Sequence, residues 1–171
     1  MNIVPFQHGD AAPREIALKH AIEQSQKQEG VRKKLYELEA SIAELPEVDC
    51  PLQHVFAPGV YARTIFIPAG TVVVGKIHKH QHLNILSQGI VSVMTEGGGK
   101  EQFQGPLTMV SPAGCKRAVY AHTDTVWTTI HCLPKDTTDL AEIEEEVIAK
   151  TYEEYEQFVL TQTAKQIGTS L

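Results

Sequence analysis

The stretch Gly70–Gly89, GTVVVGKIHKHQHLNILSQG, decides the fold predicted for this chain. Three histidines alternate with polar residues in it: His78, His80 and His82. Successive side chains of an extended strand point to opposite faces of a sheet, so the three imidazoles are expected on one face. Val72 and Val74 have the same parity, which predicts that this face is the interior one. Imidazoles gathered inside a sheet-built cavity indicate a site for a divalent transition metal.

Short apolar segments separated by glycine and proline turns surround this stretch. The predicted strands are 60–67, 71–77, 82–87, 90–95, 107–111, 116–121 and 126–132. A glycine turn at Gly97–Gly99 is expected between two of them. Many short strands without intervening helices indicate an antiparallel sandwich or a small barrel.

Helical patterns flank the strands on both sides. The first begins at Pro13, is interrupted at Gly30 and ends at Pro46. Its second half carries a heptad seam of Val31, Leu35, Leu38, Ile42 and Leu45. Two interpretations of that seam stay open: a helix packed on its own domain, or an arm that pairs with another subunit. A last helix should begin near Asp139, with Glu142 completing a capping box.

We therefore expect three regions along the chain. They are a helical arm over residues 1–47, a barrel over 48–134, and a C-terminal helix and tail over 135–171. With 171 residues, 42% of them hydrophobic, the chain is expected to form one domain with extensions.

Composition excludes several classes of function. The net charge of -6 argues against general nucleic-acid binding, which favours a basic surface. No apolar run is long enough to cross a membrane, and the first residues lack the pattern of a signal peptide. The three cysteines form no C-x-x-C pair, which fits reduced thiols in a cytoplasm.

Two segments resemble the motifs of the cupin superfamily. The histidine stretch ending at Gly89 resembles the first cupin motif, G-x5-H-x-H-x3-4-E-x6-G. Gly105-x6-Pro112-x-Gly114 resembles the start of the second, G-x5-7-P-x-G-x2-H-x3-N. The segments HLNILSQGIVSVMTEGG and SPAGCKRAVYAHTDTVWTTIH are similar to small cupin-like proteins of tailed phages and prophages. Over about residues 54–132, the resemblance implies a mainly β, double-stranded β-helix with a metal or small ligand between its sheets.

The chain departs from the cupin pattern at the metal ligands. His82 stands where the pattern has its glutamate, and Arg117 stands where the second motif has its histidine. A substitute set is available in His78, His82 and His131, with His80 as a fourth ligand. Such a set suits Zn, Ni, Fe or Mn. The alternative is a hydrogen-bonded polar core without metal, and no organic cofactor is indicated.

Three more residues are candidates for binding a small molecule. Arg117 offers a forked donor for an anion, although an arginine at a strand edge more often meets a carboxylate or solvent. Tyr120 and Trp127 offer aromatic surface, although such residues more often fill a core.

The expected function is that of a phage-type, non-catalytic cupin protein. It would assemble as a homo-oligomer through its terminal helices, in the cytoplasm of the host cell or in a virion with other virion proteins. One alternative is a metal-dependent enzyme of the dioxygenase, isomerase or lyase type, and another is a protein that binds or sequesters a small anion. The sequence has no serine–histidine–acid set and no phosphate-binding glycine loop, so catalysis stays an open question.

Overall fold

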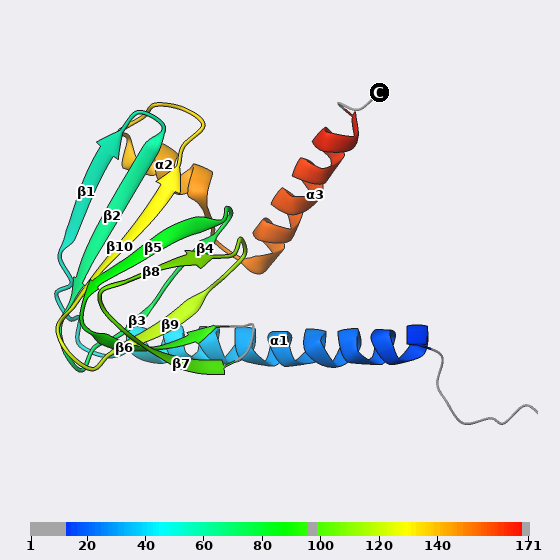
Figure 1. Cartoon of the computed structure of the whole chain (residues 1–171), viewed down its shortest axis with the longest axis horizontal. Coiled ribbons are helices and arrows are strands. Elements are labelled where there is room, and N and C mark those ends of the chain that lie inside the picture. Colours follow the sequence, from blue (N-terminus) through cyan, green and yellow to red (C-terminus); the bar gives the residue numbers. More distant parts are fainter. Residues whose placement is uncertain (1–12, 96–98, 169–171) are drawn as a thin grey trace, which may run out of the picture.

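The chain forms two antiparallel β-sheets that face each other, with helices at both ends (Figure 1). The structure is a computed structural model and describes residues 13–95 and 99–168. The five-stranded sheet has the order β1 (Leu52–Ala57), β2 (Val60–Ile67), β10 (Thr125–Cys132), β5 (His82–Gln88) and β8 (Leu107–Ser111). The four-stranded sheet has the order β3 (Val72–Val74), β9 (Arg117–Ala121), β6 (Ile90–Thr95) and β7 (Gly99–Gln104). A further two-stranded pairing joins β4 (Ile77–His78) to β11 (Ile148–Ala149).

The strand order identifies the architecture. In the first sheet β10 lies between β2 and β5, and in the second β9 lies between β3 and β6. The chain therefore passes repeatedly from one sheet to the other, and neighbouring strands are distant in sequence. This is the double-sheet jelly roll, the architecture that cupins have. The predicted fold class, a mainly β double-stranded β-helix of cupin type with N-terminal and C-terminal helices, is confirmed.

One of the hydrophobic core clusters lies between the two sheets. Leu86 and Trp127 from the five-stranded sheet contact Val91 and Val93 from the other sheet. All four are buried because alternate residues of each strand point inward. Burial of each such side chain contributes roughly 1.5–3 kcal/mol, so this cluster holds the sheets face to face.

The predicted strands agree closely with the structure except around the histidine stretch. The segments 60–67, 90–95 and 107–111 form β2, β6 and β8 with the same bounds. The predicted strand 71–77 is divided into β3 and β4, because its second part leaves the sheet to pair with β11. Strands β1 and β7 were not among the predicted segments, and Gly97 and Gly98 of the expected glycine turn lie outside the described residues.

Helix α1 (Pro13–Ala43) is continuous, so the interruption predicted at Gly30 is wrong. Gly30 is exposed, and a glycine in an exposed helix interior costs only about 1 kcal/mol without breaking the helix. The second half of α1 packs on the barrel through Leu35, which is completely buried. The ammonium group of Lys116, itself buried, lies 3.0 Å from the carboxylate of Glu39 on this helix. The N-terminal half of α1 extends beyond the barrel (Figure 1).

The single C-terminal helix that we predicted is two helices separated by β11. Helix α2 (Leu140–Val147) begins at Asp139, whose carboxylate accepts a hydrogen bond from the Ala141 amide at 2.8 Å. Asp139 is the N-cap that the sequence predicted. Glu142 does not complete the predicted capping box, because the Asp139 amide donates to Thr137 Oγ1 and the Glu142 carboxylate accepts from that same hydroxyl. Helix α3 (Tyr152–Gly168) follows β11 and diverges from α1 in Figure 1. No helix within the described ranges is long and apolar enough to cross a membrane.

The docking of α1 gives a prediction about stability. Leu35→Ala should lower the free energy of unfolding by about 2–5 kcal/mol, because the cavity it leaves lies where helix and barrel meet. Chemical denaturation at neutral pH measures this value. Leu45→Ala is the matched control, because Leu45 belongs to the same predicted seam but is 64% exposed. Equal losses from the two variants would contradict the docking of α1 on its own domain.

Candidate metal centre

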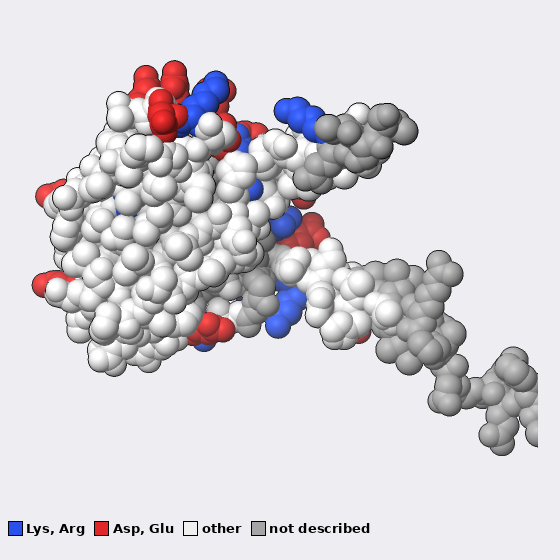
Figure 2. All heavy atoms as spheres, turned by 45° about the horizontal axis from the view of Figure 1, so that its top comes forward, with Lys and Arg blue, Asp and Glu red and all other residues white. Residues whose placement is uncertain are grey.

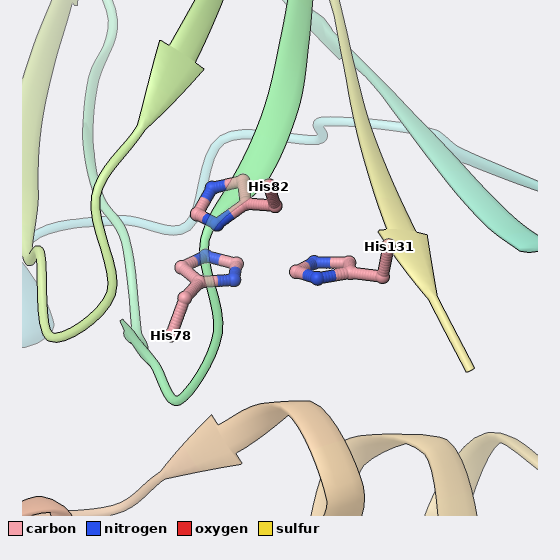
Figure 3. Close-up of side chains that lie close together, drawn as sticks. All are labelled: His78, His82 and His131. Carbon is pink, nitrogen blue, oxygen red and sulfur yellow. The ribbon is translucent and has the colours of Figure 1, made fainter. Parts of the chain in front are cut away.

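Three of the four predicted histidine ligands meet at one end of the cavity between the sheets (Figure 3). His78 comes from β4, His82 from the start of β5 and His131 from the end of β10. One ligand nitrogen from each lies within 4.8 Å of the other two. The ring centroids of His78 and His82 are 4.2 Å apart, and that of His131 is 4.9 Å from each.

Strand alternation and register explain this meeting. His82 has the inward parity of Leu86, and His131 has the inward parity of Trp127. In the antiparallel register of β10 with β5, Ile130 lies opposite Leu83, which brings the two histidines to the same end of the sheet. Strand β11 positions His78 near the other two histidines, because β11 pairs with β4 and Ile148 lies opposite His78.

His80 lies outside this cluster. Its Nε2 atom is 3.5 Å from the Glu146 carboxylate, and its ring contacts Phe158 edge-on. The chain bends at Lys79 and His80 between β4 and β5, so the strict alternation expected for the histidine stretch ends there. His78 is the last residue of β4 and His82 is the first residue of β5. Both side chains point to the interior, but they do so from two different strands.

The hydrogen bonds of the three imidazoles leave nitrogen atoms available for a ligand. His82 Nδ1 donates to the carbonyl oxygen of His80 at 3.0 Å, which leaves Nε2 of the neutral ring as the atom with a lone pair. The Nδ1 atoms of His78 and His131 are buried and have no hydrogen-bond partner among the described residues. Burying an unpaired polar atom is costly, so both nitrogens are better accounted for by a bound group. The donor set and these two orphaned atoms fit a transition metal.

The electrostatics of the site keep the histidines neutral. Burial, followed by the neighbouring His82 and His131, lowers the pKa of His78 to about 2. Burial, followed by His82 and His80, lowers the pKa of His131 to about 4. Burial also lowers the pKa of His82, although its bond to the backbone opposes that shift. Neutral imidazole is the form that coordinates a metal.

The histidines line a cavity of about 510 Å³ that also contains two arginines and an aromatic wall. Arg63 reaches it from β2 and Arg117 from β9, while α2 contributes Ile143 to its rim. Neither arginine has a carboxylate within 4.0 Å among the described residues. The guanidinium of Arg117 donates to Ser111 Oγ and lies 3.4 Å from Cys115 Sγ.

The two predicted aromatic candidates differ in position. Trp127 lines the cavity, and its Nε1 donates to Asn84 Oδ1 at 2.8 Å. Tyr120 is 40% exposed, and its ring meets His122 edge-on with centroids 4.8 Å apart. Tyr120 is not among the residues that line the cavity, because its parity on β9 turns it outward.

Sequence reasoning missed three cavity residues on the first two strands. Arg63 and Tyr61 have the inward parity of β2, and the Tyr61 hydroxyl is 2.8 Å from Nδ1 of His54 on β1. Burial raises the pKa of Tyr61. The signal was available for Arg63, since it is the one charged residue in the segment 60–67 and shares the parity of Ile65 and Ile67.

Comparisons with known proteins do not show a family for this chain. No family model and no curated protein matches the chain. A cupin superfamily protein from Desulfitobacterium hafniense matches at 16% identity and a TM-score of 0.44, over 55% of this chain and 86% of that chain. A cupin family protein with a double-stranded β-helix from Methanocaldococcus jannaschii matches at 12% identity and 0.43, over 52% and 84%.

A third solved structure, the cupin domain of Schizosaccharomyces pombe Cnp3, matches at 16% identity and a TM-score of 0.41, over 53% of this chain and 72% of that chain. These TM-scores are too low to support an inference about either the fold or the function of this chain. The assignment of a jelly roll of cupin type therefore depends on the strand order of the chain itself.

The lowered histidine pKa values predict how the metal-free protein responds to acid. An unfolded histidine titrates near pH 6.5, whereas His131 in the folded protein titrates near 4. Between these two pH values the unfolded state binds more protons than the folded state. The folded protein therefore loses stability relative to the unfolded state as the pH falls below about 6.5. The free energy of unfolding in a chelator should fall between pH 7.5 and 5 by on the order of 1–2 kcal/mol for each of His78 and His131.

The control for this prediction is a comparison of variants. His131→Gln should flatten the pH dependence, whereas His122→Gln, outside the cavity, should leave the wild-type slope. Urea denaturation at three pH values gives these slopes, and identical slopes for all three proteins would contradict the electrostatic account of the site.

Proposed function

We propose that the protein holds one transition metal on His78, His82 and His131 and uses it to bind a small organic anion in the cavity between its sheets. One observation carries this proposal. Three neutral, buried imidazoles and two arginines without a carboxylate partner among the described residues converge on the same 510 Å³ space. A volume of that size is typical of small-molecule sites.

The donor set supports a bound metal with positions open to a ligand. Three imidazoles suit Zn, Ni, Fe or Mn, and three protein ligands leave coordination positions free. The Nδ1–H of His82 is fixed by the His80 carbonyl, which orients that ring as second-shell hydrogen bonds do in metal sites. When bound, the metal would supply a Lewis acid for an oxygen atom of the ligand.

The arginines support a negative charge on that ligand. Arg63 and Arg117 both disfavour protonation of His78, because their positive charges act across the cavity. A carboxylate of a bound molecule would offset both charges and accept the forked hydrogen bonds that guanidinium groups donate. Glu144 also lines the cavity, but its carboxylate accepts a hydrogen bond from Lys76 instead.

Turnover of the bound molecule is a second candidate function, favoured by Tyr61 and His54. Their hydrogen-bonded pair lies on the cavity wall, where the Tyr61 and His131 ring centroids are 6.3 Å apart. Such a pair can hold and move a proton beside a metal-bound ligand. A dioxygenase, isomerase or lyase reaction would use these groups.

We retain an assembly role, in a virion or otherwise, as a separate proposal for the terminal helices. It is supported by the N-terminal half of α1, whose described side chains from Ala17 to Gly30 are exposed. Leu160 and Ile167 on α3 are also exposed, at 62% and 65%.

Metal content tests the proposed centre directly. Tag-free protein should contain close to one transition metal ion per chain, and His78→Ala/His131→Ala should reduce that content at least tenfold. His80→Ala and His122→Ala should retain the metal, because neither side chain belongs to the cluster. Elemental analysis of the four proteins, with circular dichroism as a check of folding, gives the result. Wild-type protein without metal after growth in supplemented medium would overturn the proposal.

Thermal stabilisation tests the proposed anion. Succinate or phosphate at 100 times the dissociation constant should stabilise the metal-loaded protein by about 2.7 kcal/mol, and uncharged glycerol should have no comparable effect. Arg63→Gln and Arg117→Gln should each weaken binding about 10-fold to 100-fold, because each loses a charged hydrogen bond worth about 1.5–3 kcal/mol. Lys135→Gln, exposed and outside the cavity, is the control for net charge. Equal effects of all three substitutions would place the anion outside the cavity.

A further inference from the structure

The outer face of the five-stranded sheet has no charged side chain. Within its strands, Arg63 is the single Lys, Arg, Asp or Glu residue, and it points into the cavity. Charged residues make up 21% of the chain, so this face is strongly depleted in them. We call it the outer sheet face, meaning the outward-pointing side chains of β1, β2, β10, β5 and β8.

An apolar row crosses this face from edge to edge. The strand registers place Val55 opposite Ala62, Ala62 opposite Ile130, Ile130 opposite Leu83, and Leu83 opposite Val110. Three members are exposed large hydrophobic residues: Val55 at 51%, Leu83 at 43% and Val110 at 57%. Single exposed apolar residues are ordinary, but a contiguous row over five strands marks an interaction surface.

The neighbouring row contains three threonines, two of which already share a hydrogen bond. Thr64 lies opposite Thr128, and their Oγ1 atoms are 2.8 Å apart. Thr128 in turn lies opposite Ile85. Because the two hydroxyl groups satisfy each other within the sheet, covering this row does not leave them without partners.

We infer that the outer sheet face binds the same face of a second copy of this chain, related by a two-fold axis. A two-fold interface must be complementary to itself, and a face without charges can meet its own copy without like-charge repulsion. Figure 2 shows the barrel surface as a broad, mostly white area with acidic and basic side chains gathered at its margins.

The size of the face fits a small specific interface. Five strands at about 4.8 Å spacing, with a rise of about 3.4 Å per residue, cover roughly 24 by 20 Å. Two such faces bury about 1,000 Å² even before the relief of the side chains is counted, which is the lower bound for a specific protein–protein interface. Sheets pack face to face in this manner at about 10 Å.

The oligomeric state of the full chain tests this inference. Sedimentation velocity should find a dimer for the wild type. Leu83→Glu/Val110→Glu should raise its dissociation constant at least 100-fold, because the substitutions bring acidic groups into an apolar row. Both positions are exposed in the protomer, so thermal melting and metal content should stay near the wild-type values. The single Val110→Glu variant, with an expected increase of at least 10-fold, serves if the double variant does not fold.

Leu160→Glu is the matched control, because Leu160 is a comparably exposed apolar residue on α3. It should leave the dimer intact. A monomeric wild type, or an unchanged dimer in both variants of the outer sheet face, would overturn the inference. Dissociation by Leu160→Glu alone would also overturn it and assign self-association to the helices. None of these outcomes depends on whether the cavity holds a metal.

Discussion

The pairing of β10 with both β2 and β5 is the constraint on which the rest of the structure depends. It joins the last strand of the barrel to the second strand and to the strand that follows the histidine loop, which closes the jelly roll. The same pairing carries Trp127 into the core and His131 to the cavity. It also creates the outer rows, because each inward residue of β10 is followed by one that points out.

The site is held at a cost to the stability of the metal-free protein. Buried Nδ1 atoms of His78 and His131 lack hydrogen-bond partners among the described residues. Two arginines face the same cavity, and neither has a described carboxylate within 4.0 Å. Natural proteins keep such uncompensated groups mainly at functional sites, where a ligand completes them. The apolar cluster of Leu86, Val91, Val93 and Trp127 lies away from the histidines and supplies the burial that offsets this cost.

The C-terminal segment links the helices to the metal centre. Strand β11 pairs with β4, and the amide of Lys79 donates to the Val147 carbonyl at 2.8 Å. The Lys79 ammonium group also donates to the Glu145 carbonyl at 2.7 Å. These contacts lie on the outer side of the loop whose inner side presents His78 and His82. A segment about 70 residues distant in the sequence therefore positions one of the three candidate ligands.

The sequence by itself determined most of the strands and their mainly β arrangement, because alternation with a period of two and glycine or proline turns are local signals. The cupin type of that arrangement was implied by the resemblance of two segments to cupin motifs. The segments 60–67, 90–95 and 107–111 needed no tertiary information. Local signals also identified Asp139 as a helix cap. The sequence also named His78, His82 and His131 as a ligand set, although the single-strand alternation used to place the first two on one face does not hold at His80.

Only the tertiary structure decided which of these residues meet. His80 is excluded because the chain bends between β4 and β5, and that bend exists because β4 pairs with the distant β11. Arg63 joins Arg117 because β2 and β9 belong to opposite sheets that face one cavity. Within the heptad seam of α1, Leu35 is completely buried, whereas Leu45 is exposed, and the periodicity of the seam does not distinguish them. Pairing between distant segments carries no local period in the sequence, and that is the physical reason these features required the folded chain.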